Sequence, residues 1–213
     1  MKSIRLFFAA VLLSLYGLSV QAQLNTEAFD AYIKVQYERF ELPAISVAIV
    51  KDGGVILSSN YGKRSEAGDK VPDQNTLYGI ASLSKAFTAA SIGMLVDEGK
   101  LHWDDKVIEH LPWFEMYDSN VTEQMTIEDL LCHRSGLITF DGDLLWYGST
   151  YSREEAVRRI RYRAPTYTFR EEFGYQNLMF MTAGEVIEEV SGKTWDAFVK
   201  ERILEPLRMN RTT

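Results

Sequence analysis

The pattern of apolar and polar positions divides the chain into a short β region and a longer helical region. Apolar residues recur with a helical period over Asn25–Phe40, and Pro43 closes that helix. Ala44–Val50 and Val55–Ser59 are rich in Val and Ile, and the glycine-containing turn Lys51–Gly54 separates them. This pattern predicts two antiparallel strands joined as a hairpin.

Helical patterns fill most of the remaining chain. They predict helices over Ser82–Glu98, Thr126–His133, Arg153–Tyr162, Asn177–Val190 and Trp195–Ile203. Thr126 and Asp129 have the spacing of a capping box, and Ser152 is placed to cap the helix that follows it. Glycines that can end helices stand at Gly99, Gly136 and Gly192. A hairpin followed by helices predicts an α+β fold.

The predicted sheet is too small to be stable alone. A two-stranded hairpin is marginal in water, and its open edges invite pairing with other strands. The C-terminal residues Leu204–Thr213 offer no convincing further strand. We therefore expect the sheet to be incomplete in this chain.

The N-terminus has the pattern of a secretory signal peptide. Lys2 and Arg5 precede the apolar run Leu6–Val20, and Ala22 provides a small residue for cleavage. A membrane anchor is the alternative, but the run is short for a spanning helix and no basic segment follows it. We expect a signal peptide over residues 1–22, one domain over residues 23–213, and an exported protein, periplasmic or secreted, without a stable membrane anchor after cleavage.

Charge and cysteine content exclude several classes of protein. The net charge of −7 argues against a nucleic-acid-binding protein, which needs a basic surface. Cys132 is the single cysteine, so no internal disulfide is expected, and a small buried residue is favoured over a thiol nucleophile or a metal ligand beside His133. The chain has three histidines, and none is spaced as a ligand pair, so we expect no metal site. No organic cofactor is expected either.

Ser82 and Lys85 form the first candidate for chemistry. Lys85 is the single charged residue between Asp73 and Asp97, in a helix that is apolar or small on every face and is therefore expected to be buried. A spacing of three places the serine and the lysine on one face, where a desolvated lysine loses its proton more easily and can act as a base. The pattern S-x-x-K is short, and chance is the alternative explanation.

Tyr175 and Asn177 form the second candidate. Residues two apart in an extended segment point the same way, so both side chains could enter one cleft just before the predicted helix at Asn177. Tyrosine can relay a proton and asparagine can donate a hydrogen bond. A tyrosine that packs against a helix start is the ordinary alternative.

Several ordered motifs run from about residue 25 to the end of the chain. They are Ser82-x-x-Lys85, Asp104 to Pro112, Leu130-Leu-Cys-His133-Arg-Ser135-Gly136-Leu137, Tyr175-x-Asn177 and Leu204-Glu-Pro-Leu-Arg-Met209. With these motifs the chain resembles the serine β-lactamase/penicillin-binding-protein-like family, in particular class C β-lactamases, the related DD-peptidases and the esterases of the same fold. The resemblance implies a helical region with an antiparallel sheet, of which only the N-terminal hairpin is present here.

The resemblance also implies a mechanism. Ser82 would attack a carbonyl and form an acyl-enzyme, Lys85, Tyr175 or both would carry the proton, and Asn177 would hold the substrate amide or the lysine. His133 is expected to brace a loop rather than act in catalysis. The loop that holds Asp141, Asp143, Trp146 and Tyr147 could line the mouth of the cleft or be solvated.

One motif of the family is missing. Its third element, K-T-G or H-x-G on a later strand, has no counterpart after Asn177, and Gly192-Lys193-Thr194 has the letters in the wrong order between two helices. We therefore expect a C-terminally incomplete chain. The expected function is a serine hydrolase for an amide or ester, acting as a monomer on a small-molecule or peptide substrate. An inactive binding protein of the same fold and a truncated remnant are the alternatives.

Overall fold

The computed structural model describes residues 24–213, so the predicted signal peptide at residues 1–22 lies outside the described residues. The chain divides into two compact units, with the boundary between Thr76 and Leu77. The boundary predicted from the sequence, between residues 22 and 23, is not tested by this division and stays a prediction. No helix in the described part is both long and apolar enough to cross a membrane.

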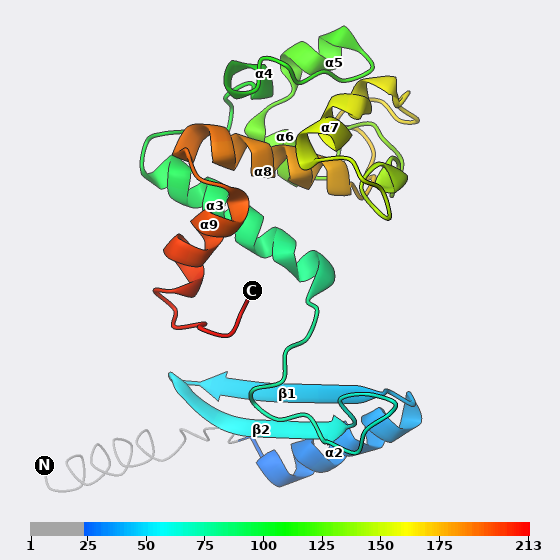
Figure 1. Cartoon of the computed structure of the whole chain (residues 1–213), viewed down its shortest axis with the longest axis vertical. Coiled ribbons are helices and arrows are strands. Elements are labelled where there is room, and N and C mark those ends of the chain that lie inside the picture. Colours follow the sequence, from blue (N-terminus) through cyan, green and yellow to red (C-terminus); the bar gives the residue numbers. More distant parts are fainter. Residues whose placement is uncertain (1–23) are drawn as a thin grey trace, which may run out of the picture. The chain divides into compact units, whose positions relative to one another are not determined.

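The first unit is a helix with a β-hairpin (Figure 1). It contains α2 (Thr26–Arg39), β1 (Ala44–Lys51) and β2 (Gly54–Gly62). The strands pair antiparallel, and the predicted hairpin is confirmed with slightly longer strands. Among residues 24–213 these are the two strands of the one sheet, in agreement with the small sheet expected from the sequence.

Polar contacts attach α2 to the hairpin. The Asp30 carboxylate accepts hydrogen bonds from the Ser59 hydroxyl and from the Tyr61 hydroxyl, the latter at 2.7 Å. The Ser59 and Tyr61 hydrogen bonds outweigh burial and hold the pKa of Asp30 below its ordinary value, so this acceptor stays ionised near neutral pH.

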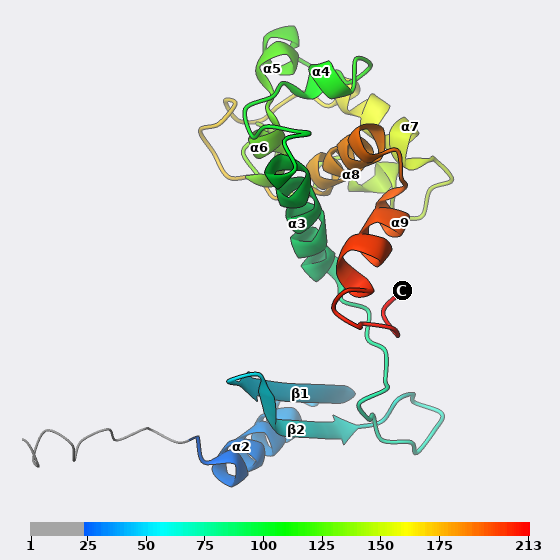
Figure 2. The same ribbon diagram turned by 90° about the vertical axis from the view of Figure 1, so that its left-hand side faces the viewer.

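The second unit, Leu77–Thr213, is helical (Figures 1 and 2). Its α-helices are α3 (Ser84–Asp97), α4 (Val107–His110), α5 (Ser119–Gln124), α6 (Ile127–Leu131), α7 (Arg153–Arg158), α8 (Asn177–Ser191) and α9 (Trp195–Val199). The unit also contains the 3₁₀ turns η1 (Ala81–Leu83), η2 (Asp143–Leu145) and η3 (Arg159–Tyr162) and the π-helical turn η4 (Lys200–Leu204). Every predicted helix is present, whereas α4 and α5 were not predicted.

Helix α8 is the centre of this unit. It contacts α3, α4, α6, α7 and α9, and both views show α3 and α9 beside it (Figures 1 and 2). Its buried face includes Leu178, Met179, Val186 and Ile187. Polar contacts also join these helices. The Trp195 indole of α9 donates a hydrogen bond to the Thr88 hydroxyl of α3 at 3.0 Å, and Arg153 of α7 forms a salt bridge with Glu188 of α8.

Local signals explain where several helices begin and end. The predicted capping box is confirmed, because the Asp129 backbone N–H donates to the Thr126 hydroxyl and the Thr126 backbone N–H donates to the Asp129 carboxylate. The Ser152 hydroxyl caps α7 as predicted. Gly192 ends α8 in the left-handed conformation, at a φ of +69°.

The prediction that the helix carrying Lys85 is buried on every face is wrong. Thr88, Ser91, Ile92 and Leu95 of α3 are buried, whereas Leu83, in the turn that leads into the helix, is 70% exposed. The apolar composition of the segment does not by itself determine burial, because burial depends on which neighbours pack against each face. Helices α8 and α9 contact α3, and Lys85 at its first turn is half-buried.

Candidate active site

Ser82 and Lys85 lie together at the start of α3. Ser82 sits in the turn η1, and the Nζ atom of Lys85 lies 3.3 Å from its Oγ atom. Ala81, directly before the serine, has a φ of +43°, a left-handed conformation that is costly for a residue with a Cβ. The tight turn leaves Ser82 exposed, where a substrate can reach it.

Asn177 joins the lysine from the start of α8. Its Oδ1 atom accepts a hydrogen bond from the Lys85 Nζ at 2.6 Å. The asparagine is the first residue of α8, so packing of α8 against α3 brings the two side chains together. The lysine amine therefore lies between the serine hydroxyl and the asparagine carbonyl.

Tyr175 completes the group. The Lys85 Nζ lies 4.6 Å from the centroid of the tyrosine ring. Burial would raise the pKa of the Tyr175 phenol, but hydrogen bonds with Lys85 and Ser82 and the charge of Lys85 lower it below its ordinary value. The structure thus brings together the four residues singled out from the sequence, and the lowered pKa lets the tyrosine lose its proton more easily than a free phenol does.

His133 supports the tyrosine segment, as expected. Its ring stacks on the Tyr175 ring with centroids 4.5 Å apart, and its Nδ1 accepts a hydrogen bond from the Gln176 backbone N–H at 3.0 Å. Burial, with the nearby charge of Lys85, lowers the pKa of His133 below its ordinary value. A neutral imidazole can accept this hydrogen bond, whereas an imidazolium cannot.

Gly174 allows two segments to approach closely. A Cβ at this position would lie 2.0 Å from the carbonyl oxygen of Leu137. The Phe140 backbone N–H donates to the Tyr175 carbonyl at 2.9 Å, and the Tyr175 backbone N–H donates to the Thr139 hydroxyl at 3.0 Å. These contacts fix the backbone that carries Tyr175.

Asp143 has a partner that the sequence did not reveal. Its two carboxylate oxygens lie 3.1 and 3.0 Å from the Asn177 Nδ2, and Oδ1 also accepts from the Trp146 indole N–H at 3.2 Å. The neighbouring Asp141 pairs with Arg163 instead, and Tyr147 is 71% exposed. Of the four residues expected in this loop, Asp143 is therefore the one that hydrogen-bonds to Asn177.

A cavity of about 230 Å³ adjoins the lysine. Its lining combines the polar side chains of the site with aromatic ones, including Lys85, Thr88, Trp146, Asn177, Phe180 and Trp195. A mainly apolar cavity beside a few convergent polar groups is typical of a small-molecule site.

Cys132 does not have the environment of a reactive thiol. It is half-buried, and burial together with the Glu128 carboxylate raises the pKa of its thiol above the ordinary value. A reactive cysteine needs the opposite shift.

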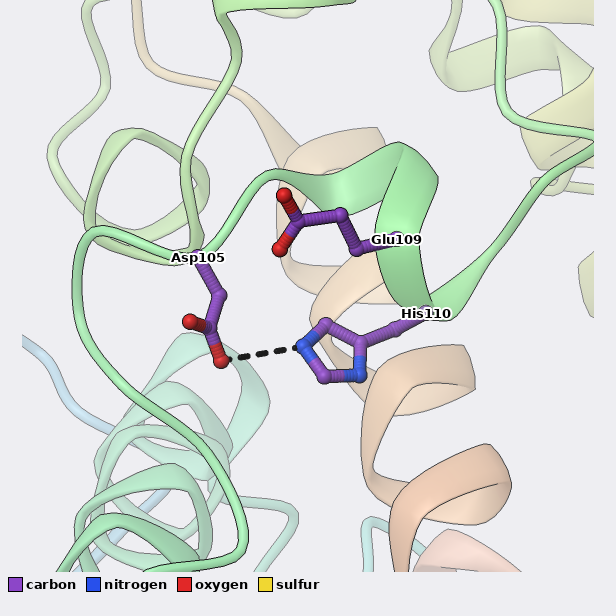
Figure 3. A group of neighbouring side chains, drawn as sticks. All are labelled: Asp105, Glu109 and His110. Carbon is purple, nitrogen blue, oxygen red and sulfur yellow. Dashed lines mark hydrogen bonds and ion pairs between the residues drawn. The ribbon is translucent and has the colours of Figure 1, made fainter.

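A group that could hold a metal ion lies at the start of α4. Asp105, Glu109 and His110 face one another there (Figure 3). The Asp105 carboxylate accepts from the His102 backbone N–H at 2.8 Å and lies 3.1 Å from the His110 Nε2, while Glu109 accepts from the Lys106 backbone N–H at 3.3 Å. These hydrogen bonds account for the arrangement as caps of a loop and a short helix.

The sequence matches one family model and several characterised relatives. Residues 29–213 match the family model described as Beta-lactamase. The chain is 30% identical over 200 residues to Protein flp of Staphylococcus aureus (strain MW2), covering 89% of this chain and 38% of that protein. It is 34% identical over 194 residues to the unguisins hydrolase ungD' of Aspergillus campestris, covering 86% of this chain and 35% of that protein. The chain thus spans less than half the length of these relatives.

Solved structures share the fold. The octameric penicillin-binding protein homologue from Pyrococcus abyssi is 30% identical, with a TM-score of 0.72 over 88% of this chain and 44% of that one. A putative beta-lactamase from Bacteroides dorei is 28% identical, with a TM-score of 0.69 over 88% of this chain and 53% of that one. EstCE1, described as a hydrolase with promiscuous acyltransferase activity, has a TM-score of 0.73 at 23% identity over 84% of this chain and 50% of that one, which speaks to the fold alone.

Proposed function

The chain belongs to the beta-lactamase family, and from that premise we propose that it is a serine hydrolase related to class C β-lactamases, which cleaves an amide or ester through an acyl-enzyme. The observation that carries the proposal is the contact of the Lys85 amine with both the Ser82 hydroxyl, at 3.3 Å, and the Asn177 carbonyl, at 2.6 Å. A serine needs an adjacent base to become a nucleophile, and this arrangement supplies one.

In the proposed reaction, the Ser82 Oγ attacks the substrate carbonyl carbon while Lys85 or Tyr175 takes the hydroxyl proton. The pKa of Tyr175, lowered by its hydrogen bonds with Lys85 and Ser82, supports a shared role. Collapse of the tetrahedral intermediate breaks the bond to the amine or alcohol, which leaves with that proton. Water then attacks the acyl carbonyl carbon, the ester bond to the Ser82 Oγ breaks, the acyl group leaves as a carboxylic acid, and the serine hydroxyl is restored.

The start of α3 assists the same step. The backbone N–H of Ser82 is one donor available to the developing oxyanion, and such a donor contributes roughly 3–4 kcal/mol to transition-state stabilisation in serine hydrolases. The turn η1 places this residue two positions before the first residue of α3, at the helix end where backbone N–H groups lack intrahelical partners.

An inactive binding protein of the same fold is not favoured. Such a protein would not need a lysine held between a serine and an asparagine, and the relatives include a hydrolase. The substrate class within amides and esters is open, since the family fold serves several reactions. We further propose that the protein acts after export, on a small-molecule or peptide substrate and as a monomer.

Turnover of a small substrate panel tests the proposal. The panel contains an aryl ester, a cephalosporin and a D-Ala-D-Ala peptide, and each is incubated with the purified chain and with Ser82→Ala. We expect hydrolysis of at least one substrate by the unaltered chain and loss of that hydrolysis in Ser82→Ala. Equal rates for the two proteins, or no rate above buffer for either, would overturn the proposal.

A further inference from the structure

We infer that Asp143 is a positioning residue, which fixes the orientation of the Asn177 amide and through it the aim of the Lys85 amine. The inference rests on the proposed function, because Asp143 can affect the reaction rate only if Lys85 takes part in proton transfer from Ser82. Asp143 lies outside the motifs Ser82-x-x-Lys85 and Tyr175-x-Asn177, and neither motif predicts its contact with Asn177.

The contacts form an uninterrupted chain. The Asn177 Nδ2 lies 3.1 and 3.0 Å from the two Asp143 carboxylate oxygens, and the Asn177 Oδ1 lies 2.6 Å from the Lys85 Nζ. The Lys85 Nζ in turn lies 3.3 Å from the Ser82 Oγ. Asp143 therefore acts on the serine through two intermediate side chains.

The chemistry of the groups sets the direction of the amide. An ionised carboxylate only accepts hydrogen bonds, so the side of the Asn177 amide that faces Asp143 must be its NH₂ group. The carbonyl oxygen then faces Lys85, where it accepts from the amine. With the amide reversed, its NH₂ group would face the donor hydrogens of the Lys85 amine, and its oxygen would face the carboxylate. Asp143 excludes that reversed state.

Asp143 is itself held in place. Gly142 precedes it at a φ of +80°, and a Cβ there would lie 2.5 Å from the Leu178 Cδ1, so the glycine lets the loop pack against the first turn of α8. The Trp146 indole N–H donates to the Asp143 carboxylate at 3.2 Å, and the Tyr147 backbone N–H donates to its carbonyl at 2.9 Å. The indole thus holds the carboxylate, and the backbone hydrogen bond holds the residue that carries it. A carboxylate held in this way can impose its orientation on the asparagine.

The test compares Asp143→Asn with a matched control in the same loop. The isosteric variant keeps the shape but can both donate and accept, so it no longer excludes the reversed Asn177 amide. Asp141→Asn removes a neighbouring carboxylate that pairs with Arg163 and does not contact Asn177. Thermal unfolding of each variant establishes that it is folded, and Asp143→Glu tests whether a displaced carboxylate restores part of the effect.

Two readouts separate the inference from the proposed function. The first is the rate at which a fluorophosphonate labels Ser82, followed by intact mass. We expect Asp143→Asn to slow labelling about 10-fold or more, because misplacement of a supporting group can cost up to ~100-fold, while Asp141→Asn labels at the unaltered rate. In an Asn177→Ala background, Asp143→Asn should have no further effect, since the aspartate acts through that amide.

The second readout does not depend on reactivity. The Asn177 side-chain NH₂ signals in an NMR spectrum, identified by their loss in Asn177→Ala, should be protected from solvent exchange in the unaltered chain and in Asp141→Asn, and lose that protection in Asp143→Asn. Unchanged protection and unchanged labelling in Asp143→Asn would overturn the inference. Lost protection in Asp143→Asn with an unlabelled parent chain would support the positioning role and count against the proposed function.

Discussion

The Nζ of Lys85 lies 2.6 Å from the Oδ1 of Asn177, although 92 residues separate them in the sequence. The lysine stands in the first turn of α3 and the asparagine is the first residue of α8. The hydrogen bond therefore exists only when these two helices are packed. The chemistry of the site therefore depends on the tertiary fold of the helical unit. Substitutions that disturb the packing of α3 on α8 should lower the reactivity of Ser82.

Lys85→Met should abolish most of the reactivity of Ser82. The substitution keeps an unbranched side chain of similar length and removes the amine that contacts the serine at 3.3 Å. A positioned base typically contributes at least about 100-fold, so fluorophosphonate labelling should slow by that order. The matched control is Lys100→Met, which removes a lysine paired with Glu98 beyond the far end of α3. Equal labelling rates in the two variants would show that Lys85 does not activate Ser82.

Tyr175→Phe should change the pH dependence of the reaction. Hydrogen bonds with Lys85 and Ser82 outweigh burial and lower the pKa of this phenol. A base works in its deprotonated form, so its contribution is present above this lowered pKa and disappears as the pH falls through it. Phenylalanine keeps the ring that stacks on His133. The rising limb of the pH profile should disappear, and the hydrolysis rate should fall about 100-fold.

The control for that experiment is Tyr147→Phe, at a tyrosine that is 71% exposed in the neighbouring loop. Its pH profile should match that of the unaltered chain. An unaltered rising limb in Tyr175→Phe would show that the tyrosine is not the group that titrates.

Gly174→Ala should destabilise the site through sterics alone. The added Cβ would meet the backbone carbonyl oxygen of Leu137 at 2.0 Å, and backbone cannot rotate away as a flexible side chain can. We expect a loss of about 1–3 kcal/mol in the free energy of unfolding, measured by urea denaturation, together with slower labelling of Ser82. Gly79→Ala is the matched control, because a Cβ there has nothing within 4 Å. An equal effect of both substitutions would contradict the close approach.

Asp129→Asn should lower stability near neutral pH but not at acidic pH. Burial would raise the pKa of the Asp129 carboxyl, but hydrogen bonds from Arg170 and Thr126 outweigh it and hold the pKa below its ordinary value. Its stabilising contribution is therefore fully present above the unfolded pKa and is lost as the pH falls through the folded one. Removing one partner of a buried pair costs about 3 kcal/mol, and the 40% exposure of Arg170 argues for the low end of the usual range.

The measurement is the difference in unfolding free energy between Asp129→Asn and the unaltered chain across pH. The difference should shrink at low pH. The control Glu128→Gln, at the exposed neighbouring position, should have the same unfolding free energy as the unaltered chain at each pH. A difference that stays constant with pH would contradict the ion pair as its cause.

Local features of the sequence predicted most of the fold. Cap signals at Thr126 and Ser152 gave helix starts that the structure confirms, because these side chains bond to backbone within a few residues. Helices α4 and α5, of four and six residues, were not predicted, whereas the equally short α6 and α7 were, because cap signals mark their starts. The burial of α3 was overestimated, because composition reports a preference for burial and not the neighbours that provide it.

The site was predictable where residue type and spacing carry the chemistry, as for Ser82 with Lys85 and Tyr175 with Asn177. Contacts between separate segments were not. The pairing of Asp143 with Asn177 spans 34 residues, and the approach of Gly174 to Leu137 is visible only from the backbone. A glycine before an aspartate gives no signal in one sequence that its loop packs on α8.

Ser82 is tested most directly by the mass of the intact chain after exposure to a fluorophosphonate, with Ser82→Ala treated in parallel. We predict one covalent adduct on the unaltered chain and none on Ser82→Ala, since the proposed nucleophile is that single hydroxyl. Circular dichroism on the same samples establishes that both proteins are folded. A folded unaltered chain without an adduct, or an adduct of equal yield on Ser82→Ala, would contradict the assignment of Ser82 as an activated nucleophile.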